Sequence, residues 1–184
     1  MKFTILLLLL TFFSTSYSST RNKTGITAST VSGTGVVFSH RFNKDWFLEL
    51  NAFAFYNQEE NKQKAELHLM SGFELQRNIW FVGKNRLYGL IGFSNWHIER
   101  TEDIIKTIND IETVNTKYDI NRIFNIGLGI GWEYNLYNKL YISLSTGLQY
   151  QNSDPFQIGI LIDRNPNGTT YFGPSFGLSL KFAL

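Results

Sequence analysis

Residues 172–184 read FGPSFGLSLKFAL, and their pattern decides the fold. Apolar side chains or proline occupy every second position, with Gly, Ser, Lys and Ala between them. Alternation with a period of two is typical of a β-strand whose two faces meet different surroundings. The same pattern occurs at 65–76 (AELHLMSGFELQ) and at 140–151 (LYISLSTGLQYQ). The sequence therefore predicts an all-β protein.

Extending this pattern along the chain indicates eight strands. We expect them at 24–30, 33–42, 46–57, 65–81, 86–100, 121–135, 139–151 and 170–184. Short links at 43–45, 83–85 and 135–138 alternate with long connections at 58–64, 101–120 and 152–169. Isoleucines at a helical spacing would allow a helix in 101–120, but Asn109-Asp110 favours the tip of a hairpin. The pattern thus predicts an eight-stranded antiparallel β-barrel.

A barrel of this size could be soluble or could lie in a membrane. Soluble barrels of the lipocalin class have an apolar interior and a charged exterior. Here the non-apolar faces carry Gly, Ser, Asn and Gln with single charges, which suits a narrow polar lumen. Aromatic residues such as Trp46, Tyr134, Tyr150 and Phe172 fall near strand ends, where membrane barrels carry aromatic girdles. We therefore predict a transmembrane β-barrel with short periplasmic turns and longer extracellular loops.

The first 18 residues read MKFTILLLLLTFFSTSYS and have the plan of a secretory signal peptide. A positive Lys2 precedes an apolar run of about ten residues, half of the ~20 that a membrane-spanning helix needs. A segment rich in small residues follows at 14–18, and we expect cleavage after Ser18 or Ser19. The expected domains are a signal peptide at 1–18 and an outer-membrane barrel at 19–184. A retained anchor helix is the alternative.

Composition argues against several classes of function. The chain of 184 residues has no Cys, which removes disulfide frameworks, thiolate metal sites and thiol nucleophiles together. Its formal charge is only +2, and its Lys and Arg residues are scattered, so we expect no nucleic-acid partner. Three His without a matching carboxylate spacing predict no metal site. We expect no cofactor.

From about Thr24 to Leu184, this pattern resembles the small eight-stranded outer-membrane β-barrel proteins of the OmpX and OmpA-barrel type. The resemblance implies fold and location only, with outer-membrane lipid and lipopolysaccharide as surroundings. It also implies a C-terminal strand that the barrel assembly machinery reads. Leu178, Leu180 and Phe182 keep the alternation of that strand, whereas family members commonly end in Phe and this chain ends in Leu184.

Charged residues at predicted inward positions form the first candidate site. They lie within a few residues of the short turns and are Arg41, Glu49, Glu74, Glu133 and Lys181. Charges in a confined space of low polarity are costly unless they are paired, so we expect one lumen charge network. Eight strands leave an interior wide enough only for side chains. We interpret the network as a plug, with a gate for ions as the alternative.

A lipid A modifying enzyme is a rival function, because some small barrels use His and Ser near their outer end. Ser94, His97 and Glu99 are the candidate cluster. Residues three apart in a strand point to opposite faces, so Ser94 and His97 could not form the nucleophile–base pair that such chemistry needs. We therefore predict no catalytic residues.

The external loops are the second candidate site, above all 152–169. This segment carries Phe156, Ile158, Ile160 and Ile162 with few charges. It could cover the barrel mouth as a lid, or offer a strand edge to a partner chain. We predict a non-catalytic protein that acts in surface interaction or envelope integrity through these loops, with an extracellular protein or surface ligand as partner. A narrow passive channel is a further alternative.

Overall fold

The computed structural model describes residues 21–59, 64–108, 111–158, 162–163 and 169–184, so the predicted signal peptide lies outside the described residues. The strands are β1 (Asn22–Ser29), β2 (Gly33–Arg41), β3 (Trp46–Glu59), β4 (Lys64–Val82), β5 (Asn85–Ile108), β6 (Ile111–Tyr137), β7 (Leu140–Ile158), β8 (Ile162–Asp163) and β9 (Thr169–Ala183). Strands β1 to β7 pair antiparallel in chain order, and β9 pairs with both β7 and β1, which closes the ring. The two-residue β8 adds to β7. The predicted eight-stranded antiparallel barrel is confirmed.

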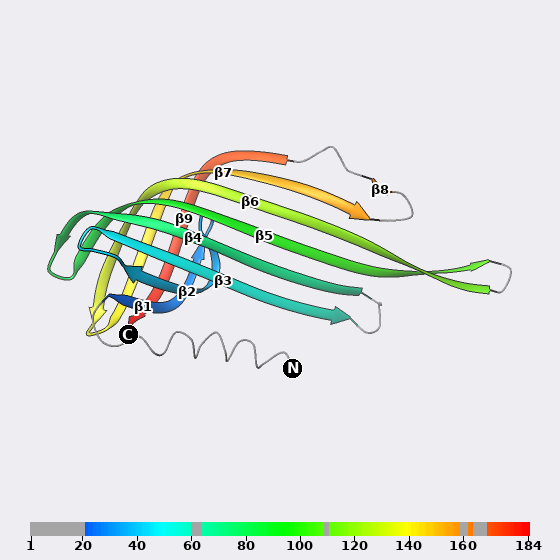
Figure 1. Cartoon of the computed structure of the whole chain (residues 1–184), viewed down its shortest axis with the longest axis horizontal. Helices are drawn as coiled ribbons and strands as arrows, with labels where there is room; N and C mark the ends of the chain where they lie inside the picture. Colours follow the sequence, from blue (N-terminus) through cyan, green and yellow to red (C-terminus); the bar gives the residue numbers. More distant parts are fainter. Residues whose placement is uncertain (1–20, 60–63, 109–110, 159–161, 164–168) are drawn as a thin grey trace.

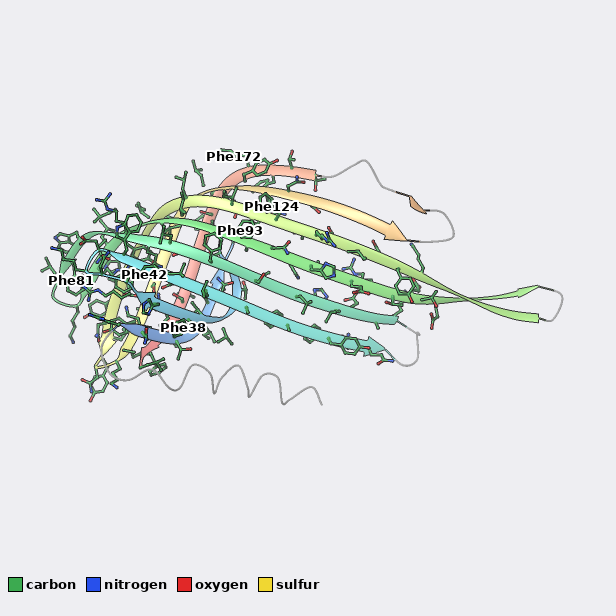
Figure 2. The ribbon with its side chains drawn as sticks, viewed as in Figure 1. Phe38, Phe42, Phe81, Phe93, Phe124 and Phe172 are labelled. Carbon is green, nitrogen blue, oxygen red and sulfur yellow. The ribbon has the colours of Figure 1, made fainter. Side chains whose placement is uncertain are left out.

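Alternation along the strands puts most of the apolar side chains outside the ring, whereas the inside holds mainly small or polar side chains with a few apolar ones such as Phe47 and Tyr88. Leu144 on β7 and Leu178 on β9 are 49% and 51% exposed, whereas Ser143 and Ser179 are buried. On the outside of β5 and β6, the rings of Phe93 and Phe124 touch edge to face with centroids 5.2 Å apart (Figure 2). This arrangement is the reverse of a soluble barrel with an apolar core.

Strands β5 and β6 are much longer than their neighbours and form a projecting ribbon (Figure 1). Strand β4 pairs with β5 as far as Glu102, and β7 pairs with β6 as far as Tyr118. Beyond these points β5 and β6 pair with each other up to Ile108 and Ile111. The segment 101–120 is therefore a hairpin that continues the barrel strands, as predicted, and not a helix.

The turn between β1 and β2 departs from the expected order of short turns and long loops. By strand direction it belongs to the end of the barrel with the long loops, yet it contains only residues 30–32. The prediction that every short turn lies at the opposite end is therefore wrong. Strands β1 and β2 are too short to reach the rim, and their turn folds into the lumen, where Val31 and Ser32 are 2% and 4% exposed.

Glycines on the inward faces of three strands make room for this turn. A Cβ on Gly92 or Gly127 would press against the side chain of Val31, and one on Gly72 would collide with the carbonyl oxygen of Ser32. The Ser29 Oγ accepts hydrogen bonds from the backbone N–H groups of Val31 and Ser32, at 3.3 and 3.2 Å. The turn is thus held at mid-height as a plug of the lumen.

A helix long and apolar enough to cross a membrane does not occur among the described residues.

Candidate functional site

The lower lumen, near the short turns, contains a cluster of buried charges. Lys181 on β9 is fully buried and donates to Glu49 on β3, and its Nζ lies 3.0 Å from Glu133 on β6. Glu133 also accepts from Lys23 on β1 at 2.5 Å and from Arg86 on β5 at 3.4 Å. Five strands therefore contribute one charge each to a connected set of ion pairs.

Glu74 completes this set from β4. It lies directly opposite Glu49 in the β3–β4 register, is 4% exposed, and accepts a hydrogen bond from the Gln76 amide at 2.6 Å. We call the six residues the lumen charge cluster: Lys23, Glu49, Glu74, Arg86, Glu133 and Lys181. The lumen charge cluster thus contains three basic side chains and three carboxyl groups.

Arg41 was expected in this network, but the structure places it elsewhere. Its guanidinium donates to the carbonyl oxygens of Asn43 at 2.9 Å and Lys44 at 3.3 Å. It also lies over the Phe47 ring, 5.6 Å from the centroid. Because Arg41 is the last residue of β2, its side chain reaches the carbonyls of the following turn. It therefore fixes that turn instead of pairing with the lumen carboxylates.

Sequence reasoning missed Lys23 and Arg86. Lys23 precedes the predicted start of the first strand by one residue. Arg86 shares the inward face of β5 with Tyr88 and Leu90, two buried side chains that make this face look apolar in the sequence. The Arg86 guanidinium carbon lies 3.8 Å from the centroid of the Phe47 ring, and aromatic faces of this kind stabilise a buried cation. Ser94, which lies further along β5 on the same side as Arg86, is the residue that could have identified this face as the inward one.

The cluster and the folded turn together close the lumen at two levels. Removing a charge from water costs several kcal/mol per ion, and ion pairs with good geometry repay that cost. The interior of an eight-stranded barrel is narrow enough for side chains to fill it at a given level. This arrangement braces the barrel wall, because the Lys23–Glu133, Lys181–Glu49 and Lys181–Glu133 pairs join strands that are not neighbours in the sheet.

The Ser94, His97 and Glu99 set is split by the strand. Ser94 is buried in the lumen, where its Oγ accepts from the Asn125 amide at 3.2 Å. His97 points to the other face, with its Nε2 3.9 Å from a Glu99 carboxylate oxygen. The serine and the histidine therefore do not meet.

Ion pairs on neighbouring strands tie β4 to β5 where the projecting ribbon begins. Lys64 pairs with Glu102 at 2.7 Å and Arg100 with Glu66 at 2.9 Å. The hydrogen bond from His68 lowers the pKa of Glu66, and the nearby Arg100 lowers it further. The hydrogen bond from Lys64 lowers the pKa of Glu102 in the same way. These pairs are exposed, and they mark the polar base of the ribbon.

The candidate loop residues are only partly placed. Phe156 and Ile158 continue the backbone of β7, and Ile158 is the register partner of Ile162 on β8. Ile160 lies outside the described residues. Within the described ranges, no group of three or more His, Asp or Glu side chains is arranged to hold a metal ion.

Comparison with solved structures finds similar chains, among them two from Acinetobacter baumannii. The crystal structure of CarO matches with a TM-score of 0.42 and 10% identity, over 89% of this chain and 97% of CarO. That of CarO2 matches with a TM-score of 0.39 and 11% identity, over 88% of this chain and 98% of CarO2. No family model and no curated protein matches the sequence. The strand register described above establishes the barrel fold.

Proposed function

We propose that this chain is an integral outer-membrane β-barrel protein of a Gram-negative cell that acts, without catalysis, in surface interaction or envelope integrity through its extracellular loops. The β5–β6 ribbon carries this proposal. A tilted strand needs only about 9–11 residues to cross a bilayer, whereas β5 has 24 and β6 has 27. The six residues 103–108 of β5 extend roughly 20 Å beyond the last pairing with β4, at about 3.3 Å per residue.

The apolar outer surface supports the membrane placement. Leu128, Ile130 and Phe176 are between 53% and 61% exposed, and water would disfavour such a continuous apolar surface. Tyr134 lies nearer the short-turn end, whereas Tyr150 and Phe172 are register partners near the other end, as aromatic girdles would be. The proposed orientation has the short turns in the periplasm and the ribbon outside the cell.

Partners follow from this placement. The outer surface would contact outer-membrane lipid and lipopolysaccharide, and the alternating C-terminal strand β9 would be read by the barrel assembly machinery, as the resemblance to the OmpX and OmpA-barrel type implies. The ribbon and the 152–169 loop would meet an extracellular protein or surface ligand. A closed lumen favours these roles over a passive channel.

Shortening the ribbon tests the proposal. Replacing 104–115 by Asn-Gly should leave the barrel intact, because the wall strands pair below this segment. We expect such cells to lose cell–cell aggregation or resistance to bile salts, down to the level of cells without the protein. Sedimentation of suspended cells and survival in deoxycholate measure the two roles, and heat-modifiable migration on gels checks folding.

A second variant, Ile158→Ser with Ile160→Ser, tests the 152–169 loop by the same assays. If both variants fold and match the wild type in both assays, the loops are not the functional part. Mass spectrometry of lipid A with and without the protein addresses the enzyme alternative, and single-channel recording in planar bilayers addresses the channel.

A further inference from the structure

The barrel wall is incomplete on one side. Strand β1 pairs with β9 as far as Gly177, and one more bond joins the Thr30 N–H to the Phe176 carbonyl. Strand β2 pairs with β3 as far as Ala52. Beyond these points β9 pairs with β7 and β3 pairs with β4, and no strand among the described residues joins β9 to β3. We call this gap the lateral notch; Figure 1 shows how short β1 and β2 are beside the neighbouring strands.

The notch lies at the height of the lipid-facing surface. The outward apolar side chains of β9 run from Phe172 to Phe182, and the last bond to the β1–β2 turn is at Phe176, in the middle of that run. The remaining residues 172–175 correspond to roughly 13 Å of strand. In the proposed orientation, the notch therefore faces the outer half of the membrane.

A chamber lies behind the notch, above the folded turn. Its volume is about 740 Å³, within the usual range for small-molecule sites. The residues that line it include the lumen-facing Met70, Ser94, Trp96, Asn125 and Gln149, together with Phe176 beside the notch. The chamber thus extends from the lumen to the wall beside the notch, and no charged residue lines it among the described residues.

Three buried polar atoms of the chamber lack a hydrogen-bond partner among the described residues. They are Nε1 of Trp96, Oδ1 of Asn125 and Oε1 of Gln149. Asn125 is 9% exposed and Gln149 is 6% exposed, and the Asn125 amide nitrogen is already bonded to Ser94. Buried polar groups are normally satisfied, because leaving one without a partner costs free energy. One donor and two acceptors at the chamber residues match a ligand head that both donates and accepts hydrogen bonds.

We propose that the chamber binds an uncharged alkyl-chain amphiphile that enters through the lateral notch. Its hydroxyl or amide head would bond Trp96, Asn125 and Gln149, and its chain would leave past Phe176 into the outer half of the membrane. The exposed apolar side chains of Phe176 and Leu178 on β9 beside the notch suit contact with an alkyl chain. An added strand from a second copy would pair the edges but would not reach Trp96 behind them. The proposal goes beyond surface interaction and rests on the membrane placement alone.

Quenching of Trp96 fluorescence tests this site. In W46F/W80F/W132F, Trp96 is the remaining tryptophan, and the probe is a brominated monoacylglycerol added to the barrel in phosphatidylcholine nanodiscs. The fatty acid with the same brominated chain is the comparison, because its carboxylate cannot donate to Asn125 or Gln149. We expect half-maximal quenching by the monoacylglycerol at an about tenfold lower concentration, the usual worth of one or two hydrogen bonds.

Matched variants assign the effect to the chamber. N125L/Q149L should raise the half-quenching concentration of the monoacylglycerol about tenfold, whereas Ser153→Ala, which lies on β7 outside the chamber lining, should leave it unchanged. Ser145→Phe fills the chamber with an apolar ring and should weaken the quenching of Trp96, although it leaves Asn125 and Gln149 in place. This variant replaces N125L/Q149L in the test if that double variant does not fold.

The W46F/W80F/W96F barrel separates failure of the site from failure of the proposed location. Its Trp132 lies on the outer surface and should be quenched by brominated phosphatidylcholine whenever the barrel is in the bilayer. Equal quenching of Trp96 by both amphiphiles, no response to the chamber variants, or no quenching of Trp96 in a barrel whose Trp132 is quenched would each overturn the proposal. Failure of Trp132 quenching would contradict the membrane placement, and with it both proposals.

Discussion

Replacing Lys181 by Met should destabilise the barrel by about 3–5 kcal/mol, the usual cost of removing one partner of a buried ion pair. Lys181 is fully buried and contacts both Glu49 and Glu133. Glu133 would keep Lys23 and Arg86, whereas Glu49 would lose the cation that the structure places against it. Urea titration of the barrel refolded in lipid vesicles measures the loss.

A second substitution shows whether the loss of stability comes from the Glu49 carboxylate that is left without a cation. Glu49→Gln in the K181M background removes the unpaired charge and should restore part of the stability. Lys64→Met is the matched control, since its pair with Glu102 is exposed and should matter little. Equal losses for K181M and Lys64→Met, or no recovery in the double variant, would contradict the role of the lumen charge cluster.

Sequence periodicity predicts the barrel because each strand separates two unlike environments. The alternation around Leu144 and Leu178 identifies the outward face without any knowledge of pairing. It also places Glu49, Glu133 and Lys181 inward, and their positions within a few residues of the short turns or of the C-terminal end put them at similar depth. The structure brings these three residues into contact.

The remaining features depend on three-dimensional relations that periodicity does not contain. Arg86 shares its face with Tyr88 and Leu90, so local composition conceals a buried cation. Arg41 lies on the strand face that was predicted to point inward, but its guanidinium binds the carbonyl groups of the turn that follows it. The inward turn at Val31 depends on glycines in three other strands. The local sequence around the turn does not show that these glycines lie next to it in the folded barrel.

The proposed membrane placement predicts a large loss of stability when a charged residue is introduced on the outer surface. Leu144 lies on the outer side of β7, where its register partner on β9 is the equally exposed Leu178. Leu144→Arg should cost about 2–4 kcal/mol, because an arginine at the bilayer midplane must be removed from water without a partner. Refolding into phosphatidylcholine vesicles with urea titration measures this cost.

Depth along one strand provides the control, because the cost of a lipid-facing arginine falls to about 0–1 kcal/mol near the interfaces. Tyr150→Arg carries the same new side chain on the same face of β7, six residues nearer the end with the long loops. Ser145→Asn changes the inward neighbour of Leu144 and should be tolerated better. An equal loss of stability for Tyr150→Arg and Leu144→Arg would show that the cost of an arginine on this face does not depend on its depth in the membrane. Tolerance of Leu144→Arg would mean that this face does not meet lipid, and a water-exposed barrel would then become the better interpretation.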